Sequence, residues 1–156
     1  AQPWSMLGND FSRSLSGQGT HHAQLLSRWA LATLPPPDTI LCSPAKRTRE
    51  TLAPLLAQWP QLLSTTEYVD SMYGASLHML LTLAEDAFSY SNRLLMIGHN
   101  PGIDHLLKNV LQQEQAVHVH KMATGTLAVI EFSSNFNRDG NAVKLLHLIN
   151  RKDFSD

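Results

Sequence analysis

Hydrophobic and polar positions along the chain alternate between strand-like and helix-like patterns. Short apolar runs predict strands at residues 39–42, 65–69, 93–97, 126–132 and 143–149. Apolar residues spaced near the helical period predict helices at residues 19–34, 43–58, 77–88 and 103–111. This alternation is typical of βαβ units, whose strands form a parallel sheet. Because only a polar turn at 133–141 separates the last two strands, we expect one of them to be antiparallel. The expected fold is a three-layer α/β/α sandwich with a mostly parallel mixed sheet.

Several helix boundaries carry recognisable signals. Ser43 followed by Pro44 predicts an N-cap with proline at the first helical position. Pro54 lies inside the same helical pattern, and because it lacks an N–H donor we expect it to kink or divide that helix. Ser76 is expected to cap the helix that follows it.

Residues 98–102, Gly-His-Asn-Pro-Gly, separate a buried strand pattern from a helical one. His99 is therefore placed at the C-terminal end of a strand, the edge of an open α/β sheet at which ligands bind. An imidazole beside the unpaired N–H groups of a helix N-terminus suits an anion. The alternative is that this segment is only a turn and that His99 is its surface residue.

A second strand-to-helix junction carries Arg47. This residue falls in the first turn of the helix, where a cation opposes the helix dipole unless an anion sits nearby. A bound phosphate would remove that conflict, and a guanidinium fork matches phosphate geometry. The alternative is a solvated basic face formed by Lys46, Arg47 and Arg49. Taken together, Arg47 and His99 predict one phosphate pocket.

The composition excludes several other classes of protein. The chain has 156 residues, 43% hydrophobic and 16% charged, which fits a single domain spanning residues 1–156. A net charge of −1 provides no basic surface for nucleic acid or for a membrane. No apolar stretch approaches a membrane span, and Cys42 is the only cysteine, so a cytoplasmic location is expected. His118 and His120 would share one face of an extended segment, but two histidines without a third ligand make a poor metal site. No metal or other cofactor is therefore expected.

Four stretches of the chain form a recognisable series. Residues 13–19 are similar to an Arg-x-Leu-Thr-x-x-Gly entry to a first helix, and residues 43–51 to a Ser-Pro-x-x-Arg-Ala-x-x-Thr helix. Residues 98–102 are similar to a second-histidine motif, and residues 123–128 to the loop and strand after it. In this order and spacing they resemble the histidine phosphatase superfamily (phosphoglycerate mutase-like), in its SixA-type phosphohistidine phosphatase branch. The resemblance covers nearly the whole chain.

The nucleophile of that family is the histidine of an Arg-His-Gly or Arg-His-Ala motif on the first strand. No such motif occurs in this chain, and His21 and His22 follow residues 13–19 instead of preceding them. We therefore expect the first strand and its Arg-His to lie immediately upstream of Ala1, which would make residues 1–156 an N-terminally incomplete domain. The alternative is a genuine loss of the nucleophile, which would leave a regulatory module that binds phosphate or phosphohistidine.

The resemblance implies a phosphatase that works through a covalent phosphohistidine, with Arg47 and His99 as its phosphate-binding and catalytic donors. Larger relatives place a carboxylic acid near the pocket to protonate an alcohol leaving group. The corresponding region here holds only Asp70, for which a solvated turn aspartate is the alternative. Because imidazole leaves readily once protonated, phosphohistidine on a partner protein is the expected substrate. Small phosphate esters are the alternative substrate class.

Overall fold

The computed structural model describes residues 10–111, 122–133, 136 and 143–154. The helices are α1 (Gly17–Thr33), α2 (Lys46–Gln58), α3 (Leu77–Phe88) and α4 (Gly102–Val110). The strands are β1 (Thr39–Cys42), β2 (Thr66–Tyr68), β3 (Leu94–Ile97), β4 (Leu127–Phe132) and β5 (Val143–Ile149). Short 3-10 turns are η1 (Asp10–Ser12), η2 (Pro60–Thr65), η3 (Asp70–Met72) and η4 (Arg151–Phe154). These elements form two units, residues 1–73 with 93–98 and residues 74–92 with 99–156.

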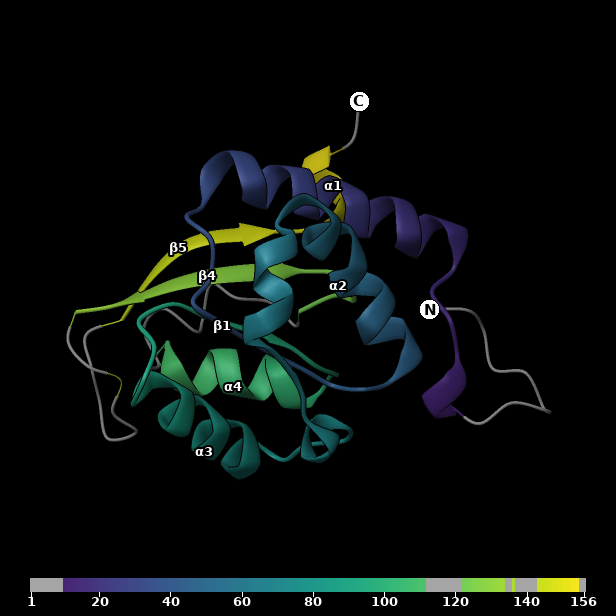
Figure 1. The fold of residues 1–156 in the computed structure, drawn as a ribbon. Helices are drawn as coiled ribbons and strands as arrows, with labels where there is room; N and C mark the ends of the chain where they lie inside the picture. The colour runs from purple at the N-terminus through teal and green to yellow at the C-terminus, as the bar shows by residue number, and fades with distance from the viewer. Residues whose placement is uncertain (1–9, 112–121, 134–135, 137–142, 155–156) are drawn as a thin grey trace. The chain divides into compact units, whose positions relative to one another are not determined.

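The first unit is built on a three-stranded parallel sheet in the order β2-β1-β3. All four residues of the central strand β1 are buried, because a strand covered on both faces has no polar side. Ile40 and Cys42 of this strand pack in one core cluster with Leu52 and Leu55 of α2. The sheet and α2 therefore share a single core (Figure 1).

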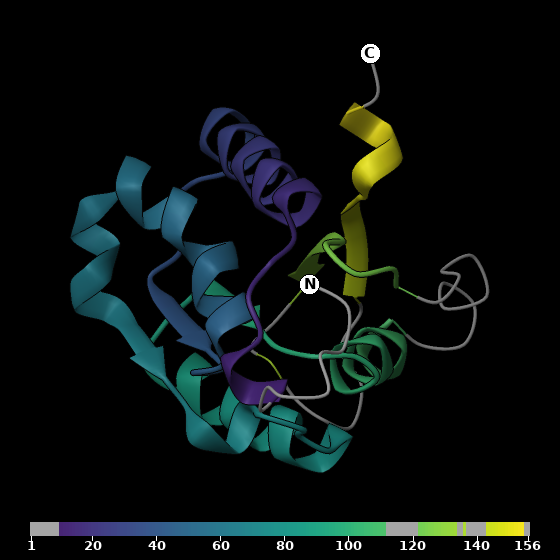
Figure 2. The same cartoon turned by 90° about the vertical axis from the view of Figure 1, so that its right-hand side faces the viewer.

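Helix α1 lies beside α2 in both ribbon views (Figures 1 and 2). Its first turn is capped by Ser16, whose hydroxyl oxygen accepts a hydrogen bond from the Gly19 N–H at 3.2 Å. Just before this cap, the Leu15 N–H donates to Glu50 Oε2 of α2 at 2.6 Å. The segment that enters α1 is thereby tied to the helix that carries Arg47.

The second unit contains α3, α4 and the antiparallel pair β4-β5, whose register shifts between Val129 and Ile130. Helices α3 and α4 lie side by side (Figure 1). Leu107 and Leu111 of the α4 segment pack with Met122 and with Val143 of β5 in the core of this unit. Ser76 caps α3 as predicted, because its hydroxyl oxygen accepts the Met79 N–H at 3.3 Å.

The expectation of one mixed sheet differs from what the structure shows. Within the described residues, β3 pairs only with β1, and β4 pairs only with β5, so the strands form two separate sheets. The α/β class, the parallel β1 to β3 arrangement and the antiparallel last pair are confirmed. Most of the predicted polar turn at 133–141 lies outside the described residues, as do His118 and His120.

Of the two effects predicted for Pro54, a kink or a division of its helix, the division does not occur, because α2 continues through Pro54 to Gln58. A proline removes one N–H donor, but Leu52 and Leu55 on either side are buried in the core. Tertiary packing therefore holds the helix across the missing hydrogen bond.

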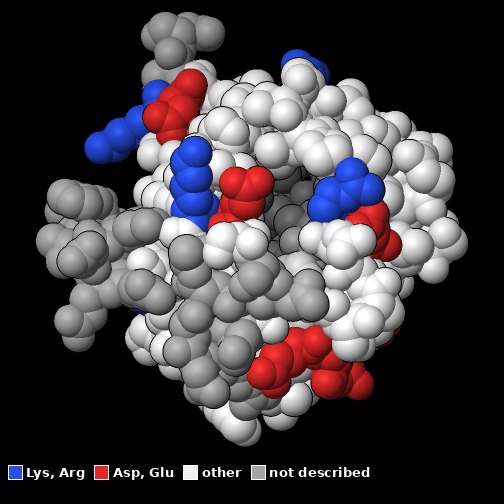
Figure 3. Space-filling model, turned by 90° about the vertical axis from the view of Figure 1, so that its left-hand side faces the viewer, with Lys and Arg blue, Asp and Glu red and all other residues white. Residues whose placement is uncertain are grey.

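The hydrophobicity of the helices and the distribution of charged side chains can both be examined in the described residues. None of the described helices is long and apolar enough to cross a bilayer. On the face drawn in Figure 3, basic and acidic side chains are few, and several lie next to one another. No broad basic patch occurs among the described residues of that face.

Candidate functional site

The junction between β1 and α2 sets the position of Arg47. Ser43 does not cap the helix, which is a correction to the sequence prediction: α2 begins at Lys46, after Ala45. The Ser43 N–H instead extends the sheet ladder by donating to the Ile97 carbonyl at 2.9 Å, so the chain turns through Pro44 and Ala45 before the helix begins. The Thr48 hydroxyl lies 2.7 Å from both the Ser43 and Ala45 carbonyl oxygens and so ties the turn to the helix.

The ends of β1 and β3 meet at one edge of the sheet, because Cys42 pairs with Ile97. The chain therefore leaves the sheet toward residue 43 and toward residue 98 from the same edge, as predicted. Arg47 is the second residue of α2 and lies in its first turn, also as predicted.

The guanidinium of Arg47 contacts an anion of the protein itself. Its NH1 donates to the main-chain carbonyl of Asp10 at 2.7 Å, and its NH2 lies 3.0 Å from Asp10 Oδ2. The side chain of Arg47 is only 15% exposed, and its Cζ lies 5.8 Å from the centroid of the Tyr73 ring. The cation at this helix N-terminus is thus balanced by Asp10, so the helix dipole alone does not require an external phosphate.

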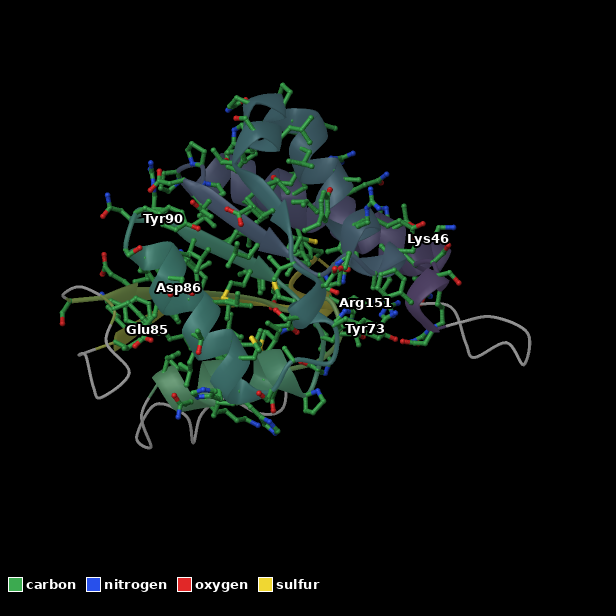
Figure 4. All side chains as sticks on the ribbon, turned by 60° about the horizontal axis from the view of Figure 1, so that its bottom comes forward. Lys46, Tyr73, Glu85, Asp86, Tyr90 and Arg151 are labelled. Atoms are coloured by element: carbon green, nitrogen blue, oxygen red, sulfur yellow. The ribbon has the colours of Figure 1, made fainter. Side chains whose placement is uncertain are left out.

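Asp10 is a site residue that the sequence reasoning missed. Arg13 holds its Oδ1 through Nε at 2.9 Å and through NH2 at 2.7 Å, and the Tyr73 hydroxyl donates to Oδ2 at 2.8 Å. The hydrogen bond from Tyr73, aided by the two arginines, lowers the pKa of Asp10. The same hydrogen bond raises the pKa of Tyr73, so Asp10 stays charged and Tyr73 stays a donor. Figure 4 shows Tyr73 on the same side of the first unit as Lys46, where α2 begins.

Asp70, the predicted candidate acid, lies at the start of η3 and is exposed. Its main-chain carbonyl accepts the Tyr73 N–H at 3.0 Å. Within the described residues its carboxylate makes no hydrogen bond or ion pair, so the carboxylate that contacts Arg47 is that of Asp10.

His99 begins the second of the two segments that make up the second unit, follows Gly98 directly, and is partly buried. Its main-chain carbonyl accepts the Ile103 N–H at 3.1 Å, which joins it to the first turn of α4. Because Arg47 and His99 lie in different units, their convergence on one phosphate stays a prediction.

Two side chains near His99 hold the loop that precedes β4. The Asn100 amide donates to the Met122 carbonyl at 2.7 Å, and the Met122 N–H donates to Asp104 Oδ1 at 2.8 Å. Burial opposes ionisation of Asp104, but this hydrogen bond and Lys108, at 2.9 Å, keep its pKa below the usual value. Both polar groups of the Met122 backbone are thereby fixed to the segment that carries His99.

Replacing Gly102 by alanine should destabilise the protein by about 1–3 kcal/mol, because an added methyl group overpacks this site. A Cβ at position 102 would lie 2.6 Å from the Ala75 carbonyl oxygen, which is main chain and cannot simply rotate away. Urea denaturation measures the change. Gly17→Ala is the matched control, because its Cβ would meet nothing within 4 Å. Equal stability of the two variants would contradict the close packing of α4 on residue 75.

Groups of three or more side chains able to hold a metal ion are absent from the part of the chain that the structure describes.

Comparison of the amino-acid sequence with known proteins finds uncharacterized relatives. Two uncharacterized proteins of Mycobacterium tuberculosis, MT1313 of strain CDC 1551 and Rv1276c of strain H37Rv, are each 33% identical over 92 residues. The match spans 59% of this chain and 55% of each relative, so the chain covers about half the length of these curated proteins. No protein-family model matches the chain.

Comparison with solved structures finds similar folds. A protein assigned as the phosphohistidine phosphatase SixA of Nakamurella multipartitia has a TM-score of 0.81 and 22% identity, over 94% of this chain and 89% of that one. Its counterpart from Agrobacterium tumefaciens has a TM-score of 0.81 and 24% identity, over 95% of this chain and 90% of that one. The protein histidine phosphatase SixA complexed with tungstate has a TM-score of 0.78 and 17% identity, again over 95% of this chain and 90% of that one. The chain therefore has a fold similar to that of the SixA phosphohistidine phosphatases.

Proposed function

We propose that this chain is the main part of a phosphatase that hydrolyses phosphohistidine on a partner protein. The observation that carries the proposal is the placement of Arg47 in the first turn of α2, at the carboxyl edge of a parallel sheet, in a SixA-like fold. The motif order supports a nucleophilic histidine supplied by an Arg-His motif that precedes residue 1 in the full-length protein. That segment would add a strand to a three-layer α/β/α sandwich.

The proposed reaction has two steps, both at phosphorus. The neutral imidazole of the nucleophile attacks in line, a new P–N bond forms, and the P–N bond to the substrate histidine breaks as that imidazole takes up a proton. Water then attacks the phosphorus of the enzyme phosphohistidine, the P–N bond to the enzyme imidazole breaks as this nitrogen takes up one proton of the water, and inorganic phosphate leaves. In both steps charge gathers on the nonbridging oxygens, and Arg47 and His99 stabilise it as fixed donors.

The carboxylate that contacts Arg47 favours an imidazole leaving group over an alkoxide. The hydrogen bond from Tyr73 lowers the pKa of Asp10, so Asp10 is not prepared to give up a proton. An alkoxide needs such an acid, whereas imidazole, with an ordinary pKa of about 6.5, is partly protonated in equilibrium with solvent near neutral pH and leaves without a dedicated acid. A SixA protein of similar fold has been solved in complex with tungstate, which is an oxyanion like phosphate, and this supports the proposal of a phosphate substrate.

A comparison of two substrates tests this function. The full-length protein should dephosphorylate a histidine-phosphorylated carrier protein with a kcat/KM at least about tenfold above that for para-nitrophenyl phosphate. A preference for small esters would instead support a phosphomonoesterase. Phosphate binding without turnover of either substrate would support a regulatory binding module.

Chelation should leave the phosphatase activity of the full-length protein unchanged, because the proposed donors are side chains of the protein rather than a metal ion. The measurement is the hydrolysis rate after treatment with EDTA and gel filtration. A rate that disappears and returns when a divalent metal ion is added back would contradict the proposed mechanism.

A further inference from the structure

Asp10 is the feature of the first unit that the proposed reaction does not explain. A carboxylate next to a phosphate-binding guanidinium repels a phosphate dianion, so it lowers the affinity of the site for its substrate. Yet Asp10 contacts both terminal nitrogens of Arg47, NH1 through its main-chain carbonyl at 2.7 Å and NH2 through Oδ2 at 3.0 Å. It therefore occupies the NH1–NH2 end of the guanidinium.

Asp10 is also held from two other directions, which argues against a carboxylate that substrate simply displaces. Arg13 binds Oδ1 with two nitrogens, at 2.9 and 2.7 Å, and the Tyr73 hydroxyl binds Oδ2 at 2.8 Å. Tyr73 also packs its ring against Arg47 and, edge-on, against Phe11, with ring centroids 5.2 Å apart. The Asp10 carboxylate is thus held in place independently of Arg47, and displacing Arg47 from it would break a charge-assisted contact.

We propose that Asp10 is a positioning residue, which fixes the plane of the Arg47 guanidinium before the phosphoryl group arrives. The inference rests on the proposed function, because it assigns Arg47 to the phosphoryl group. A long arginine side chain otherwise loses rotamer freedom when it binds its ligand. Because Asp10 holds Arg47, the rotamer freedom of the Arg47 side chain is already lost when the protein folds. The N–H groups of Arg47 are then oriented for the transition state before substrate binds.

This role predicts opposite effects on turnover and on binding. When Asp10 is replaced by asparagine, a negative charge near the phosphate disappears, so the inhibition constant of inorganic phosphate should stay the same or fall. The ion pair that orients Arg47 also disappears, so kcat should fall about tenfold. A residue that only maintained the fold would not separate the two quantities.

The experiment uses Asp10→Asn in the full-length protein with two readouts. The first is kcat together with the inhibition constant of inorganic phosphate. The second is independent of activity: nitrogen-15 NMR of the Arg47 Nη groups, assigned with Arg47→Lys. Rotation about the Nε–Cζ bond exchanges the two Nη groups of an arginine, so these groups give separate signals only while that rotation is slow. We expect separate signals in the wild type and merged signals in Asp10→Asn.

Asp38→Asn is the matched control, because Asp38 forms a carboxylate–guanidinium pair with Arg93, at 2.7 Å, beside the opposite end of β1. It should leave kcat and the Arg47 signals unchanged. Asp10→Asn with kcat within about twofold of the wild type and a lower phosphate inhibition constant would overturn the proposal and identify Asp10 as a competing anion. Unchanged Arg47 signals would overturn it as well. Merged signals in a protein whose wild type lacks phosphatase activity would instead refute the proposed function and leave the positioning role standing.

Discussion

Replacing His99 by alanine should lower kcat by about 10² or more, the loss expected for one fixed donor to the charge that develops in the transition state. The effect on KM and on phosphate inhibition should be smaller, because this donor acts mainly when charge gathers on the phosphoryl oxygens. Steady-state kinetics of the full-length protein with a histidine-phosphorylated carrier protein measure both quantities.

His105 provides the matched control for His99. It lies on α4, which follows the His99 segment, and its side chain is exposed. His105→Ala should therefore leave kcat near the wild-type value. If His99→Ala also stays within about twofold of the wild type, His99 is a surface turn residue and not a catalytic donor.

Replacing Arg47 by alanine should raise KM and lower kcat together. Arginine keeps its charge at every working pH, so Arg47 binds the phosphoryl group in the ground state as well as in the transition state. Arg47→Lys keeps the charge but loses the planar fork, and it should restore the activity only in part. Full rescue by lysine would show that charge alone matters.

Arg49 distinguishes a phosphate ligand from a solvated basic face. It lies two positions after Arg47 on α2, is exposed, and has its Cζ 4.8 Å from the centroid of the Tyr68 ring. Arg49→Ala should leave kcat and KM near their wild-type values. Equal losses in Arg47→Ala and Arg49→Ala would favour the basic face over a specific phosphate contact.

The sequence pattern predicts most of the secondary structure because burial imposes a period on each element. The predicted bounds of β1, α3 and β5 agree with the structure. At these places the hydrophobic period and the turn or cap residues point to the same answer. At the start of α2 they conflict: Ser43 has the side chain of a cap, but the strand ladder extends to Ser43, and the helix begins only at Lys46.

The contacts around the candidate site could not be predicted in the same way, because they join residues that are distant in the sequence. Asp10 lies 37 positions from Arg47 and 63 from Tyr73, and no local pattern relates them. Likewise, Asn100 reaches the Met122 carbonyl 22 positions away. The sequence does place Arg47 after one strand and His99 after another, and the pairing of Cys42 with Ile97 confirms that these strands end at one sheet edge.

A crystal structure of the full-length protein with bound vanadate would show whether Arg47 and His99 bind the same phosphoryl group. We expect one anion with Arg47 and His99 both at hydrogen-bonding distance, about 3 Å from its oxygens. An anion held by only one of them, with the other side chain pointing into a different cleft, would contradict this expectation.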